Sequence, residues 1–117
     1  MAFEAAVREV VERCPGAQAA AIVDADGIPV VVVGGDDRVE ELAAQYSTVL
    51  REIQRAAREL DHGRLRQVQV EAESLAVVLT AISAGYFLIL LLQSNAIKGQ
   101  ARFLCRLAGQ RLYSEFI

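Results

Sequence analysis

The sequence has few of the residues that build metal and redox sites. Its 117 residues include two cysteines and one histidine, and aromatic residues make up only 6%. Cys14 and Cys105 stand alone, without the CxxC or Cys/His spacing that a metal site requires. His62 has no nucleophile or metal ligand spaced to it. We therefore expect no metal and no cofactor, and we interpret both cysteines as buried thiols in a reducing cytoplasm.

A run of positive charge is also missing. The 12 Lys and Arg residues are spread along the chain, and 15 acidic residues leave a net charge of −3, so the usual electrostatic signature of nucleic-acid binding is absent. The first residues enter an amphipathic pattern with acids, which does not resemble a secretory signal. A hydrophobic content of 54% with few aromatics suits an Ala, Val and Leu core in one domain, residues 1–117, with apolar surface left for an oligomer.

Charge is absent altogether between Ser74 and Ile97. A helix of this length could span a bilayer, but Ser83-Ala84-Gly85 in its middle favours a chain reversal. The two halves, 75–82 and 86–92, have the length and composition of strands. Because the flanks also lack an aromatic belt at both ends, we interpret the stretch as a buried hairpin leading into the last helix.

The first half of the chain predicts a helix at 2–13 and strands at 18–24 and 28–34. The connection Asp24-Ala25-Asp26-Gly27 resembles the opening of a calcium loop, but the further ligands and the flanking helices of an EF-hand are missing. We interpret it as a tight hairpin turn.

The next connection, Gly34 to Asp37, lacks both phosphate-loop spacings and carries two acids that would repel phosphate. Asp37 with Glu40 instead predicts a capping box at the start of a helix over 38–60. That helix has an unbroken heptad stripe, widened along one side. Such a face could pack on the sheet with one edge and on a second copy with the other, or simply cover the sheet. The stripe comprises Val39, Ala43, Tyr46, Leu50, Ile53, Ala57 and Leu60, widened by Leu42, Val49 and Ala56.

The opposite face of the same helix carries Arg51, Arg55 and Arg58, with Gln54 nearby. These residues are candidates for docking a partner protein. Exposed charges are nevertheless common on helices, so an ordinary solvated face remains the alternative.

The third strand, 65–73, alternates apolar and polar residues, which predicts a position near a sheet edge. Ser94 and Asn95 can cap a final helix at 96–116. The order is therefore helix, strand, strand, helix, then three strands and a helix. This order predicts an α/β sandwich: a five-stranded, mainly antiparallel sheet with the middle helix on one face and both terminal helices on the other.

This order and its local sequences resemble the Roadblock/LC-seven family, which includes dynein light chains and MglB-type regulators of Ras-like GTPases. The resemblance implies a profilin-like sandwich fold. The likeness rests on the strand–turn–strand from Ala21 to Val30, on the long middle helix, and on Asn95 to Arg102. That last segment is similar to the family's N-x-G-x-x-R pattern with one extra residue before Gly99.

The resemblance implies a homodimer with a continuous ten-stranded sheet, in which the third strands pair antiparallel and the middle helices lie side by side. The strand seam would comprise Gln67, Val68, Gln69, Val70 and Glu71. The helix seam would include Tyr46, Leu50 and Ile53.

The resulting hypothesis is a non-catalytic, cytoplasmic, homodimeric binding protein that regulates a Ras-like (MglA-type) small GTPase. The chain has no nucleotide motif and no acid–base or nucleophile constellation of its own. The alternative is a structural adaptor, similar to a dynein light chain, with no effect on nucleotide turnover. A ligand sensor has the least support, because only Thr80 and Tyr86 offer polar groups in the apolar strands.

Overall fold

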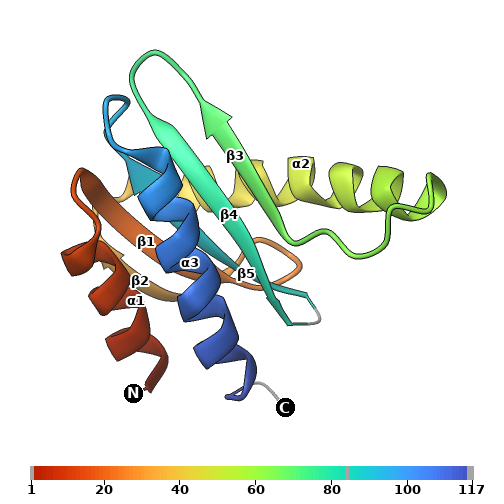
Figure 1. The fold of residues 1–117 in the computed structure, drawn as a ribbon, viewed down its shortest axis with the longest axis horizontal. Coiled ribbons are helices and arrows are strands. Elements are labelled where there is room, and N and C mark those ends of the chain that lie inside the picture. Colours follow the sequence, from red (N-terminus) through yellow and green to blue (C-terminus); the bar gives the residue numbers. More distant parts are fainter. Residues whose placement is uncertain (1, 84, 116–117) are drawn as a thin grey trace.

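The computed structural model describes residues 2–83 and 85–115, and its elements follow the predicted order (Figure 1). Ala84, in the middle of the predicted chain reversal, lies outside the described residues, as does the predicted helix end at Phe116. The elements are α1 (Ala2–Arg13), β1 (Ala17–Val23), β2 (Pro29–Gly34), α2 (Arg38–Glu59), β3 (Gln67–Glu71), β4 (Ala76–Ser83), β5 (Tyr86–Leu92) and α3 (Lys98–Tyr113).

The five strands form one sheet in the order β2-β1-β5-β4-β3, and every neighbouring pair is antiparallel. The charge-free stretch supplies β4 and β5, which pair with each other near the middle of the sheet. Among the described residues no helix has the length and apolarity to cross a membrane. The predicted hairpin is therefore confirmed, and β2 and β3 are left as the two edges.

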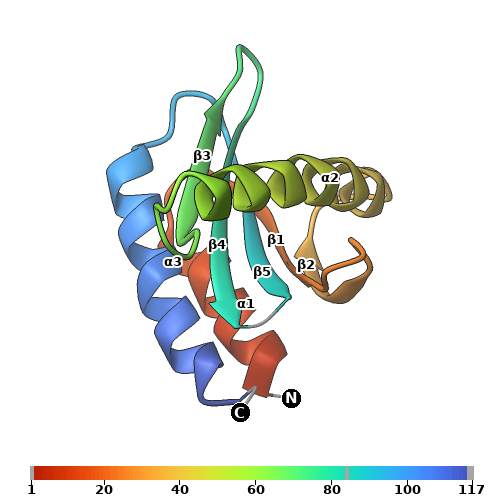
Figure 2. The ribbon, with the colours of Figure 1, turned by 90° about the vertical axis from the view of Figure 1, so that its right-hand side faces the viewer.

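Helices cover both faces of the sheet in the predicted arrangement (Figures 1 and 2). On one face, α1 and α3 pack over side chains such as Ile22, Leu88 and Leu90. On the other face, α2 packs over Leu79 and Ile89. Residues of β4 and β5 are buried on both sides, because each strand must fill two separate cores.

The β1–β2 connection is the predicted tight turn. One carboxylate oxygen of Asp24 accepts hydrogen bonds from the backbone N–H groups of Asp26 (2.9 Å) and Ile28 (3.0 Å). Gly27 has a positive φ of 82° and lies against Ala44 and Ser47 of α2, so the turn also contacts the helix.

The predicted capping box at the start of α2 is wrong. Asp37 has helical backbone angles and makes no side-chain cap, because an N-cap side chain reaches the free amides only from an extended backbone. Asp36 takes that role: its carboxylate accepts a hydrogen bond from the Arg38 N–H at 3.0 Å and pairs with the Arg38 guanidinium. These contacts hold the pKa of Asp36 below its ordinary value.

The predicted start of the last helix is also wrong. The helix begins at Lys98, and its N-cap is Ile97 in an extended conformation without a side-chain cap. Ser94 belongs to the preceding turn, where its carbonyl oxygen accepts a hydrogen bond from the Lys98 ammonium group. The turn continues through the hydrogen bond from the Ala96 N–H to the Gln93 carbonyl, so residues 94–96 are not available to start the helix.

The end of α2 is closed by a residue in the left-handed region. Asp61 has a φ of 58°, its N–H donates to the Arg58 carbonyl, and the His62 N–H donates to the Ala57 carbonyl. This pair of bonds is the Schellman motif, which glycine favours at the position of Asp61. His62 therefore closes the helix through its backbone.

Gly109 offers a test of packing between α3 and β4. A methyl group there would lie 3.5 Å from Thr80 Cγ2, an ordinary contact, inside a helix where glycine costs conformational entropy. We expect Gly109→Ala to raise the free energy of unfolding by about 1 kcal/mol, measured by urea denaturation. Gly35→Ala is the contrasting variant: its φ is 74°, and its methyl group would lie 2.6 Å from Val39 Cγ2, so stability should fall. A loss of stability in Gly109→Ala would contradict the packing described.

Asp61 tests the backbone at the end of α2. Asp61→Gly should raise the free energy of unfolding by about 0.5–1 kcal/mol, because glycine adopts the left-handed conformation without strain. Gly63→Ala is the matched control: Gly63 has a φ of 83° and open space around it, so the added methyl group should destabilise through the backbone alone. Equal stability of Asp61→Gly and the unmodified protein in urea would show that the aspartate is not strained.

Candidate interaction surface

Helix α2 is fully buried in the protomer only at positions up to Leu50. Its buried residues are Val39, Ala43, Ser47 and Leu50, and none lies beyond Leu50. The remaining turns extend past β3, away from the sheet (Figure 1). Leu50 is 2% exposed and belongs to the protomer's own core.

The apolar stripe on α2 is divided between two environments. Its inner edge packs on the sheet, whereas its outer edge is half-buried at Leu42, Tyr46 and Ile53 and open at Val49 (50% exposed) and Leu60 (64% exposed). Apolar side chains repeated at helical spacing and open to solvent are typical of a surface that another protein covers.

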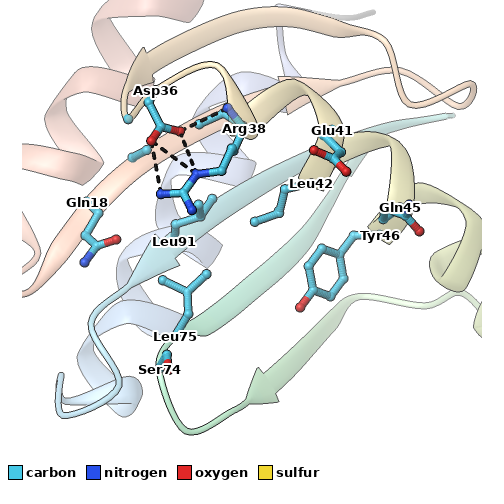
Figure 3. Close-up of a pocket in the computed structure, with 13 residues that line it drawn as sticks. Gln18, Asp36, Arg38, Glu41, Leu42, Gln45, Tyr46, Ser74, Leu75 and Leu91 are labelled. Atoms are coloured by element: carbon cyan, nitrogen blue, oxygen red, sulfur yellow. Dashed lines mark hydrogen bonds and ion pairs between the residues drawn. The ribbon is translucent and has the colours of Figure 1, made fainter.

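Two grooves flank this outer edge. The first has a volume of about 840 Å³ and lies beside the first half of α2 (Figure 3). Its apolar wall includes Leu42, Leu75 and Leu91, and the ion pair of Asp36 with Arg38 stands at its rim. The second groove, of about 1050 Å³, lies beside the second half of α2 and is lined by Ile53, Ala56, Ala57, Leu60, His62, Gly63, Arg64, Leu65, Arg66, Gln67 and Arg106.

Strand β3 is an unpaired edge next to these grooves. In the part of the chain that the structure describes, it pairs with no strand other than β4, so its other side offers free backbone groups. Val68 and Val70 pack partly against the α2 core. An edge strand with apolar residues beside an exposed apolar helix forms one continuous surface, which we call the α2–β3 surface (Leu42, Tyr46, Val49, Ile53, Leu60 and residues 67–71).

The polar face of β3 is bound to α3, a feature that the sequence pattern did not reveal. The Gln67 amide donates to Thr80 Oγ1 (3.0 Å) and to the Arg102 carbonyl (3.1 Å). The guanidinium of Arg102 in turn donates to the Gln69 side-chain oxygen. The sequence does show glutamines at alternate positions of the strand and arginines four residues apart on α3, and this pattern could have indicated the contact. These bonds hold the edge strand in place.

The four candidate docking residues lie along one flank of α2, but they have different surroundings. Arg51 donates a hydrogen bond of 2.7 Å to the Ala25 carbonyl in the β1–β2 turn, and Arg55 pairs with Glu52. Gln54 and Arg58 line a hollow of about 230 Å³ at the end of the β4–β5 hairpin. Arg51, Arg55 and Arg58 are all exposed, but the guanidinium of Arg51 is bound to the turn and that of Arg55 to Glu52.

The two cysteines and Thr80 are buried in the protein core. Cys14 and Cys105 are buried in the same core, as predicted, and burial raises the pKa of Cys105 to about 12 and that of Cys14 above its ordinary value. Thr80 is buried, with its hydroxyl oxygen held by Gln67. Within residues 2–83 and 85–115, no cluster of three or more His, Cys, Asp or Glu residues could hold a metal ion.

Comparison with solved structures shows the same fold. A Roadblock/LC7 domain from Streptomyces avermitilis is 23% identical over 97% of this chain and 96% of its own, with a TM-score of 0.88. Myxococcus xanthus MglC is 27% identical, with coverage of 98% and 99% and a TM-score of 0.72. Myxococcus xanthus MglB is 14% identical, with coverage of 99% and 95% and a TM-score of 0.89.

A comparison of the sequence with models of protein families shows which family this chain belongs to. The search of curated proteins found no match to this chain. The Roadblock/LC7 domain, however, matches residues 5–93, which include five strands and the whole of α2. The chain therefore belongs to the Roadblock/LC7 domain family.

Proposed function

We propose that this protein is a homodimer that binds a Ras-like, MglA-type small GTPase in the cytoplasm and regulates its nucleotide cycle without catalysing a reaction of its own. The observation that carries the proposal is the α2–β3 surface, which combines an open sheet edge with exposed apolar residues on α2. The fold is shared with MglB and MglC, and one solved MglB has a tetrameric arrangement.

The sheet edge favours one kind of pairing between two copies. A two-fold axis perpendicular to the sheet keeps both α2 helices on the same face and makes the β3 strands antiparallel. Centred on Gln69, this pairing sets Val68 opposite Val70 of the second copy on the α2 side. On the other side it sets Gln67 opposite Glu71 of the second copy. Apolar residues then meet apolar ones on the α2 side, while the Gln67 amide stays bound to Thr80 and Arg102 of its own protomer.

The grooves support the same arrangement. The two-fold axis also makes the α2 helices antiparallel, so the second half of one helix lies beside the first half of the other. Leu60 of one copy would then reach the groove lined by Leu42 and Leu75 of the other. The exposed residues of α2 and the grooves are thus complementary halves of a single interface.

The GTPase would be recognised by a different flank. Arg55 and Arg58 lie away from the outer apolar edge of α2, so a dimer leaves them accessible, and they can meet acidic side chains of a partner. A protein without a nucleotide site changes the cycle of a GTPase by binding one switch conformation more tightly than the other.

The dimer can be tested at exposed apolar positions. Leu60→Asp combined with Val49→Asp should convert a dimer into a folded monomer, because each charge would be buried in the interface but not in the protomer. The mass is measured by light scattering and the fold by circular dichroism. Leu107→Asp on α3, where Leu107 is 42% exposed, is the control and should stay dimeric. A monomeric unmodified protein would refute the interface. Leu50→Asp is uninformative, since Leu50 lies in the protomer's core.

The partner can be tested by calorimetric titration with the cognate Ras-like GTPase, loaded with GDP or with a GTP analogue. We expect binding to one nucleotide state at least roughly tenfold tighter than to the other. The double variant Arg55→Glu, Arg58→Glu should lose most of its binding to the GTPase. The control variant Arg8→Glu on α1 should bind the GTPase normally. Equal lack of binding in both states would reject the GTPase, and recovery of a motor or scaffold component instead would favour the adaptor.

A further inference from the structure

The sheet has a second open edge, at β2. Among residues 2–83 and 85–115, strand β2 bonds to no strand other than β1, so alternate backbone groups along its outer side face away from the sheet. Val31 and Val33 are buried beneath α1 and α3. Val30 and Val32 project from the opposite face and are 45% and 39% exposed.

This edge lacks most of the usual protection against strand pairing. Natural edge strands carry charged side chains, bulges or a covering segment. Here Pro29 and the break in the β1–β2 register at Val30 protect only the start of the strand, and no charged residue occurs from Ile28 to Gly35. Ile28 is also exposed, so an apolar strip runs beside the free backbone groups. An exposed apolar strip of this kind is typical of a surface that another molecule covers.

Negative charge lies at both ends of the strip. Residues 24–41 contain six of the fifteen acidic residues and only one of the twelve basic ones. Asp24 is engaged in its turn and Asp36 pairs with Arg38. Within the described part of the chain, Asp26 and Asp37 make no ion pair, and they lie before and after the strand.

The negative charges at the two ends of β2 favour some binding partners at this edge over others. Antiparallel pairing of two β2 strands would bring the acidic ends of both copies together, and like charges set against each other destabilise such a contact. A second copy of this chain is therefore disfavoured at β2. A strand with cations at both ends would instead gain two favourable contacts.

We propose that β2 accepts an extended segment of another protein as a sixth strand, with β-branched residues along one face and Lys or Arg at both ends. Backbone hydrogen bonds to β2 supply affinity, the β-branched side chains cover Val30 and Val32, and the terminal cations meet Asp26 and Asp37. This interface is at the opposite edge from β3, so it depends neither on the dimer nor on the GTPase.

The proposal can be tested with a fluorescent synthetic peptide, Lys-Arg-Val-Thr-Val-Thr-Val-Arg-Lys, titrated with the full chain and followed by anisotropy. A peptide with Glu at all four terminal positions should bind at least about tenfold more weakly. A basic peptide N-methylated at alternate residues keeps its charge but loses the donors along one edge. It should not bind.

Protein variants locate the site. Val32→Lys should weaken binding of the basic peptide at least about tenfold, because it sets a cation against a cationic partner on the edge itself. Leu107→Lys, at a residue of similar exposure on α3, is the matched control and should bind normally. Circular dichroism should show both variants folded.

Several results would overturn the proposal. They are equal binding of the basic and acidic peptides, binding of the N-methylated peptide, or equal loss of binding in Val32→Lys and Leu107→Lys. A Val32→Lys variant with a lower mass than the unmodified protein in sedimentation would assign β2 to a contact between copies of this chain instead.

Discussion

The structure depends on one constraint: the hairpin of β4 and β5 is apolar on both faces. Six of the seven residues of β5 are buried, and they divide between the α1–α3 core and the α2 core. A sheet with such strands at its centre is stable only when helices exclude water from both sides. The three-layer order, the central position of the hairpin and the location of the edges at β2 and β3 all follow from this requirement.

The surfaces available for recognition are those that this core leaves uncovered. Helix α2 covers the sheet only as far as Leu50, and its remaining turns carry apolar residues past the sheet. The two edges differ in character, because β3 is held to α3 through Gln67 and Gln69 whereas β2 has an uncharged apolar strip between acidic ends. A dimer formed through β3 would leave both β2 edges at the outside of its ten-stranded sheet.

The failures of sequence interpretation occurred at helix ends. Asp37 and Ser94 have the right residue types for caps, but Asp37 comes one residue after the side chain that caps α2, and Ser94 comes three residues before the N-cap of α3. Which neighbour caps a helix depends on the backbone angles at the entry, and these are set by the preceding turn. At Asp36 the bond to the Arg38 guanidinium adds to the backbone contact, and no helical periodicity could have indicated it.

The sequence by itself determined the order of elements, the two-sided burial of the hairpin, the β1–β2 turn at Asp24 to Gly27 and the family. These features rest on local chemistry: the period of apolar residues, the charge-free length and the turn residues. Only the tertiary structure decided that Leu50 lies in the protomer's core while Leu60 is open, and that the glutamines of β3 bind α3. The physical reason is that a heptad stripe defines one side of a helix, but where the sheet beneath it ends depends on contacts between residues far apart in the chain.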